Sequence, residues 1–522
     1  MSQVFTSPLP DVDIPMMPLT PFVFQHAERL ADKVALIEGM TGRSYTYGQL
    51  YGAVKKAAGG LAARGFGKGD VLAILAPNLP EYAIVFHAVA TLGGINTTIN
   101  PTYTAEEVEF QLNDAKATYL VTIPMFIDVA REAAENSDVE EIFVFGECEG
   151  ATPFAELLAA DPYEGHADID PMEDIVVLPY SSGTTGLPKG VMLTHHNLVA
   201  NLAQGEHVLA LQDDEVIIAV LPFFHIYGMQ ILMNGVLQNG STAVTMPRFD
   251  LVEYLRILQD YKVTRAYIVP PIILAMAKHP LVDQYDLSHL KQIFSGAAPL
   301  GASVEQEAAA RTGAEVVQGY GLTETSPVTH ATVPGQGRSG SIGVPISNTK
   351  VRIVDPLSGD DLGVGEEGEI WLHGPQVMKG YLNNPEATSN MIDPDGWLHT
   401  GDIGKVDEDG YWYITDRLKE LIKYKGFQVP PAELEALLLT HPAVADSAVI
   451  PVPDDEAGEV PKAFVVLKPG HEATADEIKE FVAGHVAHYK QIRDLEFLDE
   501  IPKSASGKIL RRILRDRESA KG

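Results

Sequence analysis

Apolar positions along the chain alternate between helix-like and strand-like spacing. In residues 46–65 they recur so that Leu50, Val54 and Leu61 share one helical face, and Gly65 ends the segment. Short apolar runs flanked by turn residues alternate with such helices, which predicts α/β layers around a largely parallel sheet. Strands are expected at 70–75, 117–122, 215–223, 263–271, 291–299 and 314–322, and helices at 80–94, 104–115 and 250–262.

The pattern changes in the last third of the chain. Three segments, 349–355, 368–374 and 410–416, alternate apolar and polar residues between turns, which is typical of an antiparallel subdomain. A compact set of helices and strands follows them. The sequence therefore predicts a large N-terminal domain, 1–416, and a small α+β C-terminal domain, 417–522.

Composition narrows the possible partners. The chain has 522 residues, 45% of them hydrophobic, so a sizeable core is expected, and its one cysteine excludes a disulfide framework. A formal net charge of −33 argues against a nucleic-acid partner, because phosphate binding needs an excess of Lys and Arg. No apolar run is long enough for a membrane span, and no secretory signal is visible, so a cytoplasmic protein is expected. The oligomeric state is left open.

The segment 181–190, SSGTTGLPKG, follows an apolar run and is rich in glycine and hydroxyl side chains. Glycines permit turns in which consecutive N–H groups point to one side, and such a loop binds anions, with polyphosphate as the natural ligand. The register differs from a Walker P-loop, and a polar turn between two strands is the alternative. The candidate phosphate-binding residues are Ser181, Ser182, Gly183, Thr184, Thr185 and Lys189.

Six motifs resemble, in the same order, the signatures of acyl-adenylate-forming enzymes, a superfamily of acid–CoA ligases, beetle luciferases and peptide-synthetase adenylation domains. They are SSGTTGLPKG (181–190), SGAAPLG (295–301), QGYGLTET (318–325), GWLHTGDIG (396–404), DRLKELIKYKGFQVPPAELE (416–435) and PKSASGKILRR (502–512). The chain is most similar to the 4-coumarate–CoA ligase branch. This resemblance implies a large N-terminal α/β domain and a small mobile C-terminal domain, with a hinge near Lys419.

The resemblance also implies two half-reactions that use ATP, Mg²⁺ and CoA on a small carboxylic acid. The acid attacks the α-phosphate of ATP to give acyl-AMP and pyrophosphate, and the CoA thiol then forms the thioester. Positioning and charge neutralisation dominate such chemistry, so no nucleophilic side chain is required. Lys508, His225, Thr184 and Glu324 match catalytic positions, with Glu324 as the Mg²⁺ ligand. Without the resemblance, a solvated lysine would be the favoured interpretation of Lys508 and a core histidine that of His225.

Further positions match nucleotide and CoA contacts of the family. Tyr320 offers a ring face for adenine, and Asp402 would accept both ribose hydroxyls, although Asp402 alone would also fit a helix or turn cap. Lys425, Gly426 and Arg248 match CoA contacts. The remaining matched nucleotide positions are Ala297, Gln318, Gly319, Thr323, Arg417, Lys423 and Gln428.

The acyl pocket implied by the same branch leaves the acid open. Tyr227 and Phe294 could enclose an aromatic ring or line an alkyl channel, and Phe294 stands where the branch often has a lysine. A hydroxycinnamate-type acid is favoured over a medium-chain fatty acid. The matched pocket positions are His225, Ile226, Tyr227, Gln230, Phe294, Gly296, Gly319, Gly321, Pro327 and Val328.

Three other functions are compatible with these motifs. A luciferase-like monooxygenase would emit light with luciferin and oxygen, and a carrier-loading enzyme would transfer the acyl group to a protein. A non-catalytic nucleotide-binding paralogue would have lost catalytic residues, whereas Lys508, Glu324, Asp402 and Arg417 are all present. An AMP-forming acid–CoA ligase is therefore the favoured function, with free CoA or a carrier protein left open as the acceptor.

Overall fold

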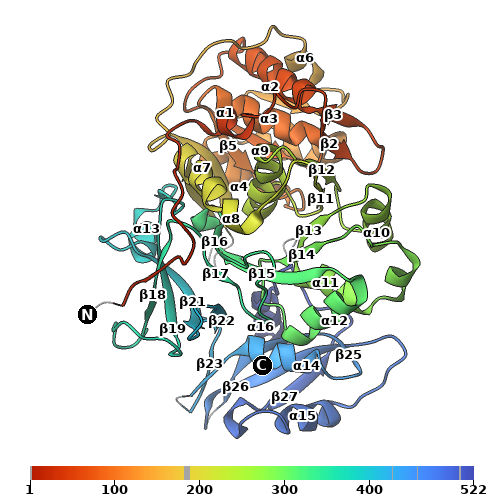
Figure 1. Ribbon diagram of the computed structural model, residues 1–522, viewed down its shortest axis with the longest axis vertical. Coiled ribbons are helices and arrows are strands. Elements are labelled where there is room, and N and C mark those ends of the chain that lie inside the picture. The colour runs from red at the N-terminus through yellow and green to blue at the C-terminus, as the bar shows by residue number, and fades with distance from the viewer. Residues whose placement is uncertain (1–2, 182–187, 426, 455, 505–506, 522) are drawn as a thin grey trace.

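The computed structural model describes residues 3–181, 188–425, 427–454, 456–504 and 507–521. The predicted site residues Ser182, Gly183, Thr184, Thr185 and Gly426 lie outside these ranges. Figure 1 shows a large N-terminal part with three sheets and a smaller C-terminal part below it. The predicted combination of parallel sheets, an antiparallel subdomain and a small α+β domain is confirmed.

The first sheet has eight strands and a parallel centre. Its strands β9 and β10 are antiparallel, with Ser181 opposite Lys189, so the glycine-rich segment connects two paired strands. In spatial order the strands are β20 (Gly380–Tyr381), β10 (Lys189–Thr194), β9 (Ile175–Ser181), β5 (Ile95–Thr98), β4 (Val71–Leu75), β6 (Tyr119–Thr122), β7 (Glu141–Val144) and β8 (Thr152–Pro153).

The second sheet has nine strands and carries most of the candidate site. It is parallel from β15 through to β2, and antiparallel at both ends. In spatial order the strands are β17 (Val344–Pro345), β16 (Val328–Ala331), β15 (Glu315–Gly321), β14 (Gln292–Ser295), β13 (Arg265–Ile268), β11 (Val216–Ala219), β12 (Thr242–Thr245), β2 (Val34–Glu38) and β3 (Ser44–Thr46).

Helix α3 (Pro80–Thr91) lies between these two sheets. Its residues 80–90 are all buried, and it contacts β5 of the first sheet and β2 of the second, which explains why the segment is apolar on every side. Thr104 and Asp250, the first residues of two predicted helices, each accept a backbone N–H as the cap of α4 and α10. The other helices of this part are α1 (Leu19–Val23), α2 (Tyr47–Ala62), α4 (Ala105–Ala115), α5 (Ile127–Ala134), α6 (Ala155–Leu158), α7 (His195–Gln204), α8 (Glu206–Leu209), α9 (Val236–Gln238), α10 (Leu251–Asp260), α11 (Pro270–Lys278), α12 (Ala302–Thr312) and α13 (Pro385–Met391).

In the described residues, four helical segments of the N-terminal part are not α-helices. One of them, η2, is a π-helix that directly follows Tyr227, and π-helices are rare and frequent at functional sites. The segments are η1 (Pro124–Phe126), η2 (Gly228–Gly235), η3 (Pro280–Gln284) and η4 (Thr323–Thr325), and a fifth, η5 (His488–Lys490), belongs to the C-terminal part. No helix in the described ranges has the length and apolar character needed to cross a bilayer.

The third sheet is the predicted antiparallel subdomain. Its inner face packs Val351, Ile353, Ile370 and Leu372 around Trp412, which is 1% exposed. In spatial order the strands are β1 (Phe5–Thr6), β18 (Lys350–Val354), β19 (Gly368–His373), β21 (Leu398–Val406) and β22 (Trp412–Arg417). The division predicted after residue 416 falls one residue before the end of β22 and stays a prediction.

The C-terminal part is a five-stranded sheet with helices packed on it (Figure 1). Its core is apolar, and α14 begins with Pro431, a residue favoured in the first turn of a helix. The strands are β24 (Phe427–Val429), β23 (Ile422–Tyr424), β26 (Gly458–Leu467), β25 (Val444–Asp454) and β27 (Asp494–Phe497), and the helices are α14 (Pro431–Leu438), α15 (Ala475–Ala483) and α16 (Arg511–Ser519).

Candidate active site

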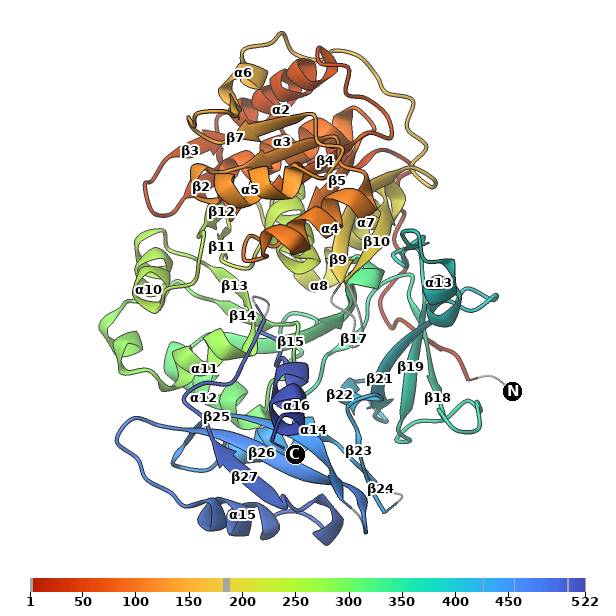
Figure 2. The ribbon, with the colours of Figure 1, turned by 180° about the vertical axis from the view of Figure 1, so that it is seen from behind.

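The candidate site lies at the carboxyl ends of the parallel strands β13, β14 and β15, the edge at which α/β sheets bind ligands. Figure 2 shows the chain that precedes α16 rising from the C-terminal part towards β13 and β14. A Cβ atom on Gly507 would lie 3.1 Å from Val269 Cγ2 and 3.2 Å from Pro271 Cδ. The turn that carries Lys508 therefore packs directly against this edge, and its glycine has a left-handed φ of 78°.

Tyr320, Asp402 and Arg417 form one hydrogen-bonded group. The Tyr320 hydroxyl donates to Asp402 Oδ2 at 2.5 Å, and Arg417 Nε lies 3.2 Å from Asp402 Oδ1. Asp402 and Arg417 are opposite each other across β21 and β22, and Asp402 is 4% exposed. The Asp402 charge raises the pKa of Arg417. This group brings together the predicted adenine platform and the predicted ribose carboxylate.

Glu324 lies where the predicted phosphate loop meets the second sheet. Its Oε1 accepts hydrogen bonds from Ser181 Oγ at 3.1 Å and from the Tyr381 hydroxyl at 2.8 Å. Lys189 Nζ stands 4.8 Å from the centre of the Tyr381 ring. A carboxylate held in this way, next to the phosphate loop, is a hard oxygen ligand that fits Mg²⁺.

Lys508 and His225 are electrostatically coupled to this group. Burial and then the charge of Arg417 lower the pKa of Lys508 to about 8, while Asp402 and Glu324 act in the opposite direction. Burial and then Lys508 lower the pKa of His225 to about 3, so this imidazole is neutral near pH 7. Its Nδ1 accepts the backbone N–H of Tyr227 at 3.2 Å, which leaves Nε2–H as the donor.

Aromatic rings lie directly on glycines in the predicted acyl pocket. A Cβ atom on Gly296 would lie 2.8 Å from Tyr227 Cε1, and one on Gly319 would lie 2.4 Å from Phe294 Cζ. Tyr227 and Phe294 are 8% and 6% exposed, and the Tyr227 hydroxyl donates to Phe294 O at 3.4 Å. The structure thus brings both predicted aromatic residues to one place, and the two glycines are required by their rings.

The remaining predicted acyl-pocket positions include buried and closely packed residues. Gln230 is fully buried; its Nε2 donates to Leu198 O at 2.7 Å and its Oε1 accepts from Asn234 at 3.1 Å. These bonds fix the Gln230 amide, and its predicted contact with the acid stays a prediction. Ile226 and Val328 are buried, and a Cβ atom on Gly321 would lie 2.0 Å from Pro327 O.

Two predicted nucleotide positions shape the loop after β14. The Gln318 side chain accepts the N–H of Leu300 at 3.3 Å and donates to Leu300 O at 3.2 Å and to Glu305 at 2.8 Å. Ala297 has a left-handed φ of 71° in the same loop. Thr323 begins η4, and its carbonyl accepts the N–H of Ser326 at 3.4 Å.

The predicted CoA and hinge residues lie apart from this group. Lys423 and Gln428 face each other across the β23–β24 hairpin, and both are exposed. Lys425 is exposed, with Nζ 3.7 Å from Glu456, and Lys419 and Arg248 are exposed as well. Figure 2 shows this hairpin at the lower edge of the C-terminal part, away from the edge that Lys508 reaches. Their CoA and hinge roles stay predictions.

Sequence reasoning missed Tyr381 and Glu305. Tyr381 reaches Glu324 only because β20 pairs with β10, an association of distant segments that no local motif signals. Glu305 accepts from Gln318 and from Gly340 N at 3.2 Å, and its place in the first turn of α12 was the one available signal.

Comparison with known proteins agrees with the geometry. The AMP-binding enzyme family matches residues 23–382, and the AMP-binding enzyme C-terminal domain matches residues 433–508. The chain is 48% identical to 4-coumarate–CoA ligase 3 of Oryza sativa subsp. japonica, covering 99% of this chain and 95% of the relative. It is 45% identical to 4-coumarate–CoA ligase 1 of Petroselinum crispum, covering 98% and 96%. The crystal structure of the anthranilate CoA ligase AuaEII in complex with anthranoyl-AMP superposes with a TM-score of 0.91 at 29% identity, covering 98% of this chain and 99% of that one.

The three-sheet N-terminal part, the Tyr320–Asp402 pair and the Lys508 turn define an acyl-adenylate-forming enzyme. The chain belongs to the AMP-binding enzyme family, in the branch of the 4-coumarate–CoA ligases. The family resemblance carried by the six motifs is confirmed.

Proposed function

We propose that this protein is an ATP-dependent, AMP-forming acid–CoA ligase that acts on hydroxycinnamate-type acids such as 4-coumarate. The observation that carries the proposal is the packing of Gly507, next to Lys508 in the C-terminal domain, against Val269 and Pro271 at the carboxyl end of β13. Relatives named 4-coumarate–CoA ligase, matched over nearly their whole length, support the same reaction and acid class.

In the first half-reaction the acid's carboxylate attacks the α-phosphorus of ATP, and the bond to the pyrophosphate oxygen breaks. Lys508 binds the carboxylate and the α-phosphate together, which offsets their mutual repulsion. His225 donates Nε2–H to a carboxylate oxygen and keeps the acid aligned. Mg²⁺, held by Glu324, would neutralise phosphate charge. Tyr320, Asp402 and Arg417 orient the nucleoside, and the phosphate-loop side chains Ser181 and Lys189 bind phosphate oxygens.

In the second half-reaction the CoA sulfur attacks the acyl carbon, and AMP leaves. The exposed β23–β24 hairpin, with Lys423, Lys425 and Gln428, would reach the site once the C-terminal domain rotates about Lys419. Arg248 would bind a CoA phosphate at the entrance. One domain would thus present Lys508 for adenylation and Lys425 for thioester formation.

The pocket favours a planar acid. Tyr227 and Phe294 stand over glycines at the same place, and aromatic rings pack best against other rings. Rates with 4-coumarate should therefore exceed those with medium-chain fatty acids. Higher rates with the fatty acids would agree with an acid–CoA ligase but would reject hydroxycinnamates as its acids.

The experiment that tests the proposal is Lys508→Ala, assayed in both half-reactions. Acid-dependent pyrophosphate release should fall by a factor of roughly 100 or more, while thioester formation from supplied acyl-AMP should persist. Lys479→Ala, at a partly exposed ion pair with Asp476 on α15, is the matched control and should retain both. Equal loss of both half-reactions in Lys508→Ala would reject the division of roles.

We place the reaction in the cytoplasm, because ATP and CoA are drawn from the pools of the cell interior. Cell fractionation followed by the thioester assay tests this location, and activity recovered only with another compartment would contradict it.

A further inference from the structure

A buried cluster of charges lies where the connection between the two domains meets the C-terminal domain. It consists of Asp416 at the end of β22, Glu420 in the connection, Glu435 on α14 and Arg511 at the start of α16. The three carboxylates are 5%, 7% and 9% exposed, and two of them, Glu420 and Glu435, contact the Arg511 guanidinium. The proposed mechanism uses none of these four side chains.

Arg511 makes hydrogen bonds to Glu435 and Val449 and an ion pair with Glu420. Its Nη2 lies 2.7 Å from both carboxylate oxygens of Glu435, and its Nε lies 3.2 Å from Glu420 Oε2 and 3.2 Å from Val449 O. Glu435 Oε1 also accepts the N–H of Val449 at 2.8 Å. The guanidinium therefore ties α16 to α14, to β25 and to the interdomain connection.

Asp416 extends the cluster to the N-terminal domain. Its Oδ2 accepts the N–H of Ala432 at 2.9 Å, and its Oδ1 accepts the N–H of Arg417 at 2.7 Å. Ala432 is in the first turn of α14, whose own preceding residue, Pro430, provides no side-chain cap. A carboxylate at the end of β22 thus caps a helix of the other domain.

The turn that carries Lys508 is attached directly to Arg511. Ser504 N donates to Lys508 O at 2.8 Å, and Leu510 N donates to Pro502 O at 2.8 Å, so two backbone hydrogen bonds join residues 502–504 to residues 508–510. Helix α16 begins at Arg511, three residues after Lys508. A shift of the Arg511 backbone therefore also shifts the end of the turn that carries Lys508.

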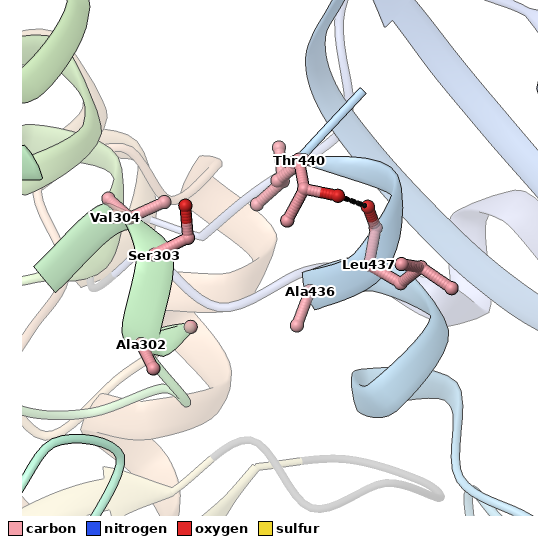
Figure 3. Close-up of a pocket in the computed structure, with 8 residues that line it drawn as sticks. Ala302, Ser303, Val304, Ala436, Leu437 and Thr440 are labelled. Carbon is pink, nitrogen blue, oxygen red and sulfur yellow. Dashed lines mark hydrogen bonds between the residues drawn. The ribbon is translucent and has the colours of Figure 1, made fainter. Parts of the chain in front are cut away.

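Apolar packing alone does not fix α14 against the N-terminal domain. A cavity of about 230 Å³ separates α14 from the start of α12, lined by Ala302, Ser303 and Val304 on one side and by Ala436, Leu437 and Thr440 on the other (Figure 3). Close packing is what normally fixes one element against another, and here it is incomplete. The hydrogen bonds of the cluster reach α14 at Ala432 and Glu435, which do not line this cavity.

Buried ion pairs are poor sources of stability, because desolvation offsets their attraction, and apolar residues of similar volume often replace them without loss. What such a pair does supply is a unique geometry, since a guanidinium bonded at Nη2 and Nε has one orientation. We propose that Arg511 is a positioning residue for adenylation: through Glu435 and Glu420 it holds the Lys508 turn in the orientation that reaches the α-phosphate. This inference rests on the proposed function.

The test compares Arg511→Met with the double variant Glu435→Leu/Arg511→Met and with Arg512→Met. Arg512 is the exposed neighbour of Arg511 and serves as the matched control. The double variant also removes the carboxylate that contacts Arg511 Nη2, so it buries less unpaired charge than the single variant does. Pyrophosphate release should fall roughly 100-fold in both Arg511 variants, the loss expected for a misplacement of about 1 Å, while Arg512→Met stays at the wild-type rate.

Thioester formation from supplied acyl-AMP shows whether a variant has misplaced Lys508 only or has lost the fold of the C-terminal domain. That half-reaction needs the β23–β24 hairpin of the same domain, so it should remain within about threefold of wild type if the domain is folded. Arg511→Lys keeps the charge without the planar fork and should recover part of the adenylation rate. Wild-type adenylation in the double variant, or equal loss of both half-reactions in it, would overturn the inference. Failure of the wild type itself to release pyrophosphate would instead reject the proposed function.

Discussion

The hydroxyl of Tyr320 and the carboxylate of Asp402 share a 2.5 Å hydrogen bond across 82 residues of sequence. This bond therefore fixes the ring proposed to stack on adenine relative to the carboxylate proposed to bind ribose. Its second anchor is Arg417, opposite Asp402 on β22, the last strand before the interdomain connection. The Asp402 carboxylate thus links the proposed nucleoside site to β22, the strand that leads into the interdomain connection.

Tyr320→Phe should weaken ATP binding while leaving the ring in place. A hydrogen bond to a charged group contributes about 1.5–3 kcal/mol, so the KM for ATP should rise roughly 10- to 100-fold with a smaller change in kcat. Tyr413→Phe is the matched control, because the Tyr413 hydroxyl, on β22, also donates to a carboxylate, Asp407, at 3.1 Å but lies outside the site. Equal changes in the two variants would argue against a nucleotide role for Tyr320.

Adenylation should lose activity in alkaline solution. The pKa of Lys508 is lowered to about 8, and only the protonated amine can neutralise the carboxylate and the phosphate. The kcat/KM for adenylation, which reports the free enzyme, should therefore fall above about pH 8. Lys508→Arg, whose guanidinium stays charged, should be slower but should lack this alkaline limb. If kcat/KM of Lys508→Arg falls above pH 8 as in the wild type, the titrating group is not Lys508.

Gly296→Ala should impair acid binding without affecting ATP. The added methyl group would stand 2.8 Å from Tyr227 Cε1, so the ring must move into the acyl pocket. The KM for the acid should rise roughly 10- to 100-fold, with the KM for ATP unchanged. Gly52→Ala in α2, where a Cβ atom meets nothing within 4 Å, is the control and should be at least as stable as wild type. An unchanged KM for the acid would show that Tyr227 does not line the acyl pocket.

Glu435 should make stability depend on pH. Burial raises its pKa from 4.5 to about 7, so the folded protein retains a proton that the unfolded chain releases at lower pH. The contribution of this group to the unfolding free energy therefore falls as pH rises from about 4.5 to 7 and is constant above that. Asp416, raised to about 6 by burial, acts in the same direction.

The variant Glu435→Gln cannot titrate at this position. Its Tm relative to wild type should therefore be higher at pH 8 than at pH 5 when both proteins are melted across that range. Glu472→Gln, at an exposed position, should show no such trend. A difference that is flat across the range would show that Glu435 ionises at its ordinary pKa.

Local sequence signals predicted the elements well. Thr104 and Asp250 cap the helices that they were expected to begin, since a cap depends on bonds within one turn. The alternation in residues 349–416 predicted the antiparallel sheet for the same reason: side chains on one strand face share one environment.

Pairings between distant segments were not predictable from such signals. The motifs identified Glu324 and Gln318 as site positions, but not that Tyr381 binds the first or that Glu305 binds the second. Gln230 was placed in the acyl pocket by resemblance, and the structure adds that its amide is bonded to Leu198 and Asn234. The buried Arg511 cluster depends on four elements at once, so nothing in its own motif identifies it.

The most direct test of the account is pyrophosphate release by the purified protein with Mg-ATP and 4-coumarate, before and after CoA is added. The account predicts acid-dependent pyrophosphate and enzyme-bound coumaroyl-AMP without CoA, followed by AMP and coumaroyl-CoA once CoA is present. No pyrophosphate from any member of a panel of hydroxycinnamates, benzoates and medium-chain fatty acids would contradict it.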